Sequence, residues 1–128
     1  MKHKEDLAKG WIMKGDSDLA TIKLTINSDG PYDTGCFHAQ QAVEKYLKAI
    51  LAFHGEPIPR THDLEEIQLL CIKWIADSDF RDLSLEDLSD YAVSVRYDFE
   101  FWPDLNTARE ALLIVNTVRV IIMDCINV

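Results

Sequence analysis

Residues 37–49 read Phe-His-Ala-Gln-Gln-Ala-Val-Glu-Lys-Tyr-Leu-Lys-Ala, and this stretch decides the fold. It lies in a helix predicted over about residues 33–54, where apolar side chains recur every three or four positions. These apolar side chains are Ala39, Val43, Tyr46, Leu47, Ile50 and Phe53. A second group falls within roughly 80° on another side of the helix, at about 100° per residue. That polar group is His38, Gln41, Lys45 and Lys48.

The segments before and after this helix also have helical periodicity. The first helix is predicted over about residues 4–26. Gly15 lies on its apolar stripe and predicts a close approach by another helix, since glycine is otherwise unfavourable inside a helix. A third helix is predicted from near Asp63 to about residue 75, and a shorter one over about 84–95 with Ser84 as a capping candidate. The last covers about 104–126, and residues 77–79 are interpreted as a connection.

Chain length and composition favour one domain. The 128 residues, 48% of them hydrophobic, suffice for a single core and are too few for two ordinary domains. No segment shows the alternation typical of a strand. We therefore expect a single domain, residues 1–128, of the all-α class. Its architecture is predicted to be an antiparallel four-helix up-and-down bundle with an additional short helix before the last long helix.

Two apolar features exceed what such a core needs. The last predicted helix carries one apolar stripe and further apolar residues on its other side, the latter being Leu113, Val120 and Met123. A helix of this kind buries more than one face, and we expect a homodimer to cover the second. Four aromatic residues precede the helix and either plug the end of the bundle or form a docking or base-stacking surface. They are Tyr97, Phe99, Phe101 and Trp102.

The distribution of charge limits the ligands. Residues 1–62 contain eight Lys/Arg and eight Asp/Glu, whereas residues 63–128 contain five and fourteen, which gives the whole net charge of −9. Extended nucleic-acid binding needs clustered positive charge, so the second half disfavours RNA as a partner. A phosphate site is expected to use the first half or isolated arginines.

Other residue types exclude further classes of protein. Cys36, Cys71 and Cys125 are widely spaced, which indicates neither a disulfide framework nor a zinc-binding pair. The four histidines lack the i,i+4 spacing of metal ligands, so we expect no metal site. There is no apolar run long enough to cross a membrane and no secretory signal at the N-terminus. We expect a cytoplasmic protein with no membrane contact.

The run at residues 37–49 resembles the second helix of the prokaryotic HEPN domain family, F-x-A-Q-Q-A-x-E-K-x-L-K-A. Two further stretches follow in the expected order. PRTHDL at residues 59–64 is similar to the family's P-x-T-H-D-L, and Tyr91 followed by Arg96 and Tyr97 is similar to its Y…R-Y stretch before the last helix. The resemblance covers most of the chain. It implies a helical bundle, frequent dimerisation and a minimal nucleotidyltransferase as partner.

The resemblance also implies two kinds of activity. Some members look like nucleotide-binding accessory domains, whereas others are ribonucleases with an R-x4–6-H motif at the start of the last helix. Here Arg96 is present, but no histidine follows His62 in the chain. Acid–base cleavage of RNA needs a group that titrates near neutrality, and arginine does not. We therefore expect no catalytic residue, unless His62 or His38 substitutes from another element.

A nucleotide-phosphate site is predicted, with ATP or another nucleotide as the ligand and no other cofactor. Its candidate residues are Lys45, Lys48, Arg96, His62, His38 and Gln41. Each of the strongest candidates has a structural alternative. Lys48 can pair with Glu44 while Lys45 is solvated. His62 can tie its proline-rich loop to the bundle, and Arg96 can form a salt bridge with Asp98 or Asp90.

Three functional hypotheses are compatible with these observations. The first is a non-catalytic, dimeric HEPN module that binds a nucleotidyltransferase and a nucleotide phosphate. The second is a ribonuclease toxin of a toxin–antitoxin pair with a non-standard active site. The third is a purely structural dimerisation module. The missing histidine favours the first and third over the second, and the lysines of the neutral first half favour the first over the third.

Overall fold

The structure is a computed structural model that describes residues 3–126, and all regular elements in that range are helical. The all-α class predicted from the sequence is therefore confirmed. The helices are α1 (Lys4–Asn27), α2 (Tyr32–Phe53), α3 (Leu64–Cys71), α4 (Ser78–Asp82), α5 (Glu86–Tyr97) and α6 (Leu105–Cys125), with a 3₁₀ turn, η1 (Ile72–Trp74), after α3.

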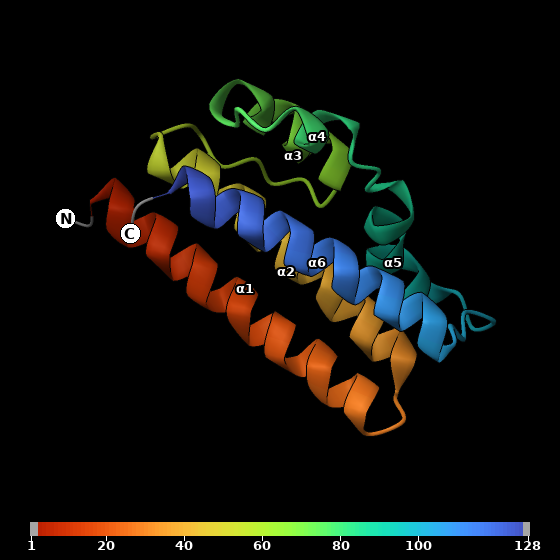
Figure 1. Ribbon diagram of the computed structural model, residues 1–128. Coiled ribbons are helices and arrows are strands. Elements are labelled where there is room, and N and C mark those ends of the chain that lie inside the picture. The colour runs from red at the N-terminus through yellow and green to blue at the C-terminus, as the bar shows by residue number, and fades with distance from the viewer. Residues whose placement is uncertain (1–2, 127–128) are drawn as a thin grey trace.

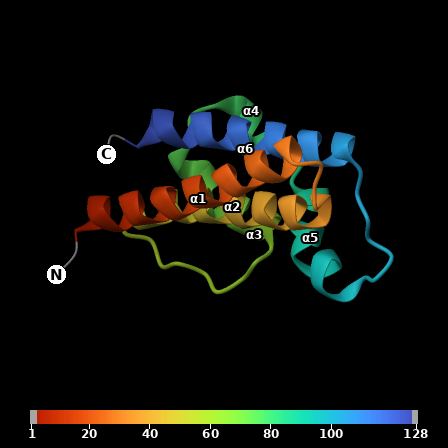
Figure 2. The ribbon, with the colours of Figure 1, turned by 90° about the horizontal axis from the view of Figure 1, so that it is seen from below.

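Three long helices, α1, α2 and α6, form the body of the molecule (Figure 1). The colours show that α1 runs in one direction and that α2 and α6 run in the opposite direction, and the second view agrees (Figure 2). This is the order of the first, second and fourth rods of an up-and-down bundle. The third rod is replaced by the short helices α3, α4 and α5, so the connection before α6 contains two extra helices instead of the one predicted.

The central element is α2, which contacts α1, α3, α5 and α6. Its apolar side chains therefore face neighbours on several sides, and most of its residues are buried. The core around it draws on every helix, and α3 and α5 each contribute an apolar stripe that faces α2. The largest fully buried apolar side chains are Ile22, Tyr46, Leu47, Ile50, Leu51, Leu64, Ile67, Phe80, Leu85, Leu88 and Ile122.

The close approach predicted at Gly15 is present between α1 and α2. A Cβ atom at residue 15 would lie 2.6 Å from Cε1 of the buried Tyr46 ring, a distance that side chains do not tolerate. Glycine is unfavourable in a helix by about 1 kcal/mol relative to alanine. Here that cost is offset because the absent side chain lets the tyrosine ring pack directly on the α1 backbone.

The predicted boundaries of the shorter helices are partly wrong. The α-helix from Leu64 ends at Cys71 and continues only as η1, so it does not reach residue 75. The predicted connection 77–79 instead begins α4, because the Asp77 side chain accepts a hydrogen bond from the Asp79 amide (2.9 Å). Ser84 is not a cap: α5 begins after Leu85, which is 1% exposed, and burial of that leucine sets the start of the helix.

The aromatic residues before α6 divide into two groups. Phe101 packs against Tyr91 with 5.4 Å between ring centroids, whereas Tyr97, Phe99 and Trp102 are exposed. The interpretation that all four plug the bundle is therefore wrong for three of them. On α6, Leu113 and Val120 are also exposed, and self-association through this helix remains a prediction. Among the described residues, no helix has the length and apolar character required to cross a membrane.

Candidate functional site

A buried carboxylate, Glu44 on α2, is the centre of the first polar cluster. It is 4% exposed and accepts three hydrogen bonds, from Lys48 Nζ (3.0 Å), His62 Nδ1 (2.8 Å) and Gln40 Nε2 (3.2 Å). Residues 40, 44 and 48 lie on the same side of α2 because they are four apart, whereas His62 comes from the segment before α3. We call Gln40, Glu44, Lys48 and His62 the glutamate cluster.

The ionisation of Glu44 follows from these contacts. Burial raises the pKa of its carboxyl group, but the hydrogen bonds from His62, Lys48 and Gln40 more than offset burial, and the pKa is lowered overall. The Lys48 ammonium is itself buried, its side chain being 7% exposed. The two opposite charges therefore stabilise each other where neither is fully hydrated.

Two glutamines connect the cluster to its surroundings. Gln40 Nε2 also lies 3.2 Å from the carbonyl oxygen of His62, and Gln41 Nε2 donates to Gln40 Oε1 (2.6 Å). These hydrogen bonds form a single network that links α2 to the loop that carries His62. Because these donors and acceptors are matched to one another, the loop is held in one position relative to α2.

A second polar cluster lies between α1 and α2. The Asp18 carboxylate, on a side chain 9% exposed, accepts from His38 Nδ1 (2.8 Å) and Lys45 Nζ (2.6 Å). We call Asp18, His38 and Lys45 the aspartate cluster. It has the same composition as the core of the first, a carboxylate with one histidine and one lysine, but it joins two long helices instead of a helix and a loop.

The two histidines have equivalent geometry. In each, Nδ1 lies 2.8 Å from a carboxylate oxygen and donates to it, because an ionised carboxylate only accepts, and Nε2 lies on the other side of the ring. The His62 side chain is 62% exposed and the His38 side chain 31% exposed. An imidazole oriented in this way by a carboxylate can accept a proton from, or hydrogen-bond to, a ligand.

A third polar contact ties α6 to α1. Arg119 donates to both oxygens of Asp16 (2.8 and 3.2 Å), and the Tyr46 hydroxyl donates to the same carboxylate (2.6 Å). Burial and the neighbouring Asp16 raise the pKa of Tyr46, so the hydroxyl stays protonated as a donor. No local sequence pattern predicts this contact, because the arginine and the aspartate are 103 positions apart.

Arg96, in the last turn of α5, differs from these paired groups. Its Nε donates to the Ala92 carbonyl (2.9 Å), and its guanidinium carbon lies 5.8 Å from the ring centroids of both Phe37 and Tyr97. Within residues 3–126 it forms no ion pair with a carboxylate, so the predicted alternative of a salt bridge to Asp98 or Asp90 is absent there. The remaining guanidinium nitrogens are available to a ligand.

The six candidate residues therefore do not form one site. Lys48 and His62 belong to the glutamate cluster, as the structural alternatives for both residues predicted. Lys45 and His38 belong to the aspartate cluster, so Lys45 is paired, not merely solvated. Each lysine forms an ion pair with a different carboxylate. The two lysines are therefore not arranged to bind one phosphate together. Gln41 supports Gln40, and Arg96 stands near Phe37.

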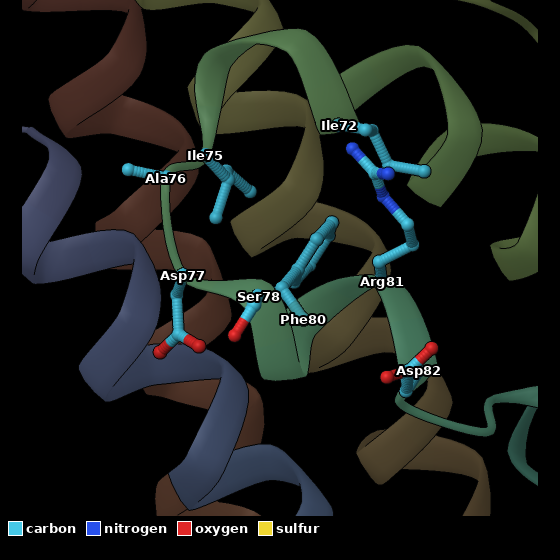
Figure 3. Close-up of a pocket in the computed structure, with 8 residues that line it drawn as sticks. All are labelled: Ile72, Ile75, Ala76, Asp77, Ser78, Phe80, Arg81 and Asp82. Carbon is cyan, nitrogen blue, oxygen red and sulfur yellow. The ribbon is translucent and has the colours of Figure 1, made fainter.

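Two of the hollows in the described structure bear on these candidates. One, of about 350 Å³, is lined by residues of η1, α4 and the chain between them. Figure 3 shows the Phe80 ring pointing into it, with Asp77 and Asp82 at opposite edges. None of the six candidates lines it. The smaller, of about 240 Å³, lies between the loop and α5 and is lined by His62, Asp63, Ser89, Asp90, Ala92 and Val93.

The described residues contain no group of histidine, cysteine or acidic side chains arranged to hold a metal ion. The arrangement as a whole is that of a helical bundle whose second helix carries buried ion pairs on two sides, with an unpaired arginine before the last helix. A family model, the HEPN domain, matches residues 8–126. The chain therefore belongs to the HEPN domain family. No curated protein and no solved structure matches it.

Proposed function

We propose that this protein is a non-catalytic HEPN module that binds a minimal nucleotidyltransferase and holds a nucleotide phosphate at Arg96. One observation carries the proposal: Arg96 presents guanidinium nitrogens that no carboxylate of the described chain neutralises, beside the rings of Phe37 and Tyr97. Guanidinium groups bind phosphate oxygens through paired hydrogen bonds, and this contact is stronger than that of a neutral donor.

The surroundings of Arg96 suit a nucleotide better than a long polyanion. The rings of Phe37 and Tyr97 lie beside its guanidinium, and aromatic rings can stack on a base. In contrast, Lys45 and Lys48 are neutralised by Asp18 and Glu44. The net charge of −9 opposes the extended phosphate backbone of RNA. A single nucleotide needs only the local positive charge.

The family and the surface of α6 support the partners in this proposal. The resemblance described above implies a nucleotidyltransferase partner and frequent dimerisation. Leu113 is 67% exposed and Val120 is 59% exposed, which leaves an apolar surface on α6. A second copy can bury such a surface through a symmetric contact. We therefore propose a homodimer as the binding unit.

Calorimetry with ATP tests the phosphate site. The wild-type dimer is expected to bind ATP, and Arg96→Ala is expected to weaken the affinity by about tenfold or more, equivalent to about 1.4 kcal/mol. Arg109→Ala is the matched control, because Arg109 is an exposed arginine on α6. Absence of ATP binding by the wild type, or an equal loss in both variants, contradicts the site.

A second candidate function has its own supporting observation. The exposed His62 has the Nδ1–Glu44 contact that orients an imidazole as a base, and ribonucleases of the family combine an arginine with a histidine. In this alternative, His62 Nε2 accepts the 2′-hydroxyl proton of RNA as the 2′-oxygen attacks the phosphorus. The bond from phosphorus to the 5′-oxygen breaks, that oxygen takes a proton from water, and Arg96 stabilises the phosphate charge. Cleavage of single-stranded RNA that is lost in both His62→Gln and Arg96→Ala would favour it over the binding module.

A further inference from the structure

Residues 97–102, the last residue of α5 and the connection that follows it, display aromatic side chains to solvent. Tyr97 is 71% exposed, Phe99 88% and Trp102 74%. We call residues 97–102 the aromatic loop. Single exposed apolar residues are normal, but each aromatic side chain buries about 150–250 Å² when covered. Three within six positions form a concentrated apolar surface of the kind that marks an interaction site.

The aromatic loop has a defined conformation. The Asp98 amide donates to the Ser94 carbonyl (3.0 Å), and the Phe101 amide donates to the Asp98 carbonyl (3.1 Å). The Asp98 side chain accepts from the Glu100 amide (3.0 Å), and the Phe101 ring packs on Tyr91. One aromatic residue thus anchors the loop while Phe99 and Trp102 remain outside. A surface already ordered in this way loses little conformational entropy on binding.

The charge of the aromatic loop indicates the kind of partner. Between positions 96 and 104 the sequence contains three acidic residues, Asp98, Glu100 and Asp104, against a single basic one, Arg96, so the region is acidic overall. All three acidic residues are exposed. A partner surface with positive charge is attracted to such a region, whereas a second copy of the same loop would be repelled. The apolar side chains between the acidic residues require apolar groups on the partner as well.

The position of the aromatic loop suits a separate partner. In both views the connection between α5 and α6 projects from one end of the molecule, and the beginning of α1 and the end of α6 lie at the other end (Figures 1 and 2). A protein bound there would not cover the exposed residues Leu113 and Val120 on α6. A symmetric dimer through α6 is therefore compatible with a different partner at the loop.

We propose that the aromatic loop is the docking surface for a separate protein whose contact region combines lysine or arginine with apolar side chains. The inference rests on the proposed function in one respect: it assumes that the protein is a binding module. It adds where that module binds a partner and which side chains the partner's surface carries. It shares Tyr97 with the proposed phosphate site but needs neither Arg96 nor a bound nucleotide, so ATP binding can fail without affecting it.

A pair of fluorescent peptides tests the chemistry. The first is an amphipathic helix of roughly 18 residues, about five turns, with leucine and tryptophan on one face and lysine on the other. The second has glutamate in place of each lysine. At low salt the full-length protein is expected to bind the lysine peptide about tenfold or more tightly than the glutamate peptide, by fluorescence anisotropy. Equal affinities, or no binding of the lysine peptide, overturn the inference.

Two double variants locate the contact. The double variant Phe99→Ser/Trp102→Ser is expected to weaken binding of the lysine peptide about tenfold or more. Both side chains are exposed, so their loss removes apolar contact with the peptide without disturbing the core. Met13→Ser with Leu24→Ser, at exposed positions of α1, is the matched control and is expected to leave binding unchanged. Loss of binding in both variants, or in neither, overturns the location. Circular dichroism verifies that both remain helical.

A complex distinguishes the failure of this inference from failure of the proposed function. The protein is co-expressed with a nucleotidyltransferase encoded beside it, and the complex is measured by size-exclusion chromatography with light scattering. A complex that forms with the wild type and not with Phe99→Ser/Trp102→Ser supports both. A complex that survives the double variant overturns the docking surface alone, whereas a wild type that forms no complex contradicts the proposed function. A homodimer mass reduced by the double variant shows that a second copy occupies the loop, which also overturns the inference.

Discussion

The glutamate and aspartate clusters share a carboxylate, a histidine and a lysine, and they differ in the burial of the lysine. The Lys48 side chain is 7% exposed and the Lys45 side chain 23%, whereas both carboxylates are less than a tenth exposed. The aspartate cluster lies between two long helices that also share a large apolar contact. The glutamate cluster joins α2 to the loop before α3, which other contacts also hold, among them the ion pair of Lys73 with Glu56 (2.8 Å). The more buried lysine of the glutamate cluster therefore depends more strongly on its carboxylate than the lysine of the aspartate cluster does.

The largest expected effect comes from removing the buried carboxylate of the glutamate cluster. Glu44→Gln leaves the Lys48 ammonium buried without a counter-charge, which costs about 3 kcal/mol or more. Asp18→Asn is expected to cost about 1 kcal/mol, because water can reach Lys45 and His38. Urea unfolding followed by circular dichroism measures both. Equal losses would contradict the difference between the clusters.

Removal of the lysines sharpens the same difference. Lys48→Met places an apolar side chain of similar length in a buried position and leaves Glu44 bound to His62 and Gln40, at an expected cost of about 2 kcal/mol. Lys45→Met is expected to change the free energy of unfolding by about 0.5 kcal/mol or less. The same unfolding experiment applies. A larger loss of unfolding free energy in Lys45→Met than in Lys48→Met would contradict the expected difference between the two clusters.

The pH dependence of stability provides a third measurement. The pKa of Glu44 is lowered in the folded protein from an unfolded value near 4.5. Its contribution is therefore fully present above about pH 4.5 and is lost as the pH falls through the lower folded value. In Glu44→Gln we expect the acid decline of stability to become less steep, by at most about 1.4 kcal/mol per pH unit for one proton. An unchanged slope below pH 4.5 would show that Glu44 is not linked to folding in this way.

The smallest effects are expected from the exposed histidines. His62→Gln and His38→Gln are each expected to change global stability by about 0.5 kcal/mol or less, since one end of each ring is in water. They should differ locally. Loss of His62 is expected to increase hydrogen exchange at the amides around residues 60–64, because the loop loses a contact with α2. Loss of His38 is expected to leave exchange in α1 unchanged. Greater exchange in α1 than in the loop would contradict this.

The sequence predicted the long helices well because they have strong periodicity and clear ends. Gly15 also indicated the approach of Tyr46 correctly. The shorter helices were less predictable, since α4 has only five residues and its first turn depends on the Asp77 side chain instead of an apolar pattern. The exposure of the aromatic loop depends on tertiary packing. Phe101 packs on Tyr91 and Phe99 does not, and the local sequence does not indicate which of the two rings is covered.

The candidate site was predictable in its residue types but not in its pairing. A helical projection grouped Lys45 with Lys48, yet it gave no information about which carboxylate faces each lysine. Asp18 is 27 positions from Lys45, so only the packing of α1 on α2 brings them together. The i,i+4 pair of Lys48 with Glu44 was recognisable from spacing alone.

The beginning of α1 and the end of α6 lie at the same end of the bundle (Figure 1). A label or carrier protein attached near either of these helix ends would therefore stand a full helix length from the aromatic loop. Surface immobilisation through such an attachment leaves the loop facing the solution. The molecule can thus be tethered for single-molecule or sensor measurements while the aromatic loop, where a partner protein is expected to bind, stays accessible.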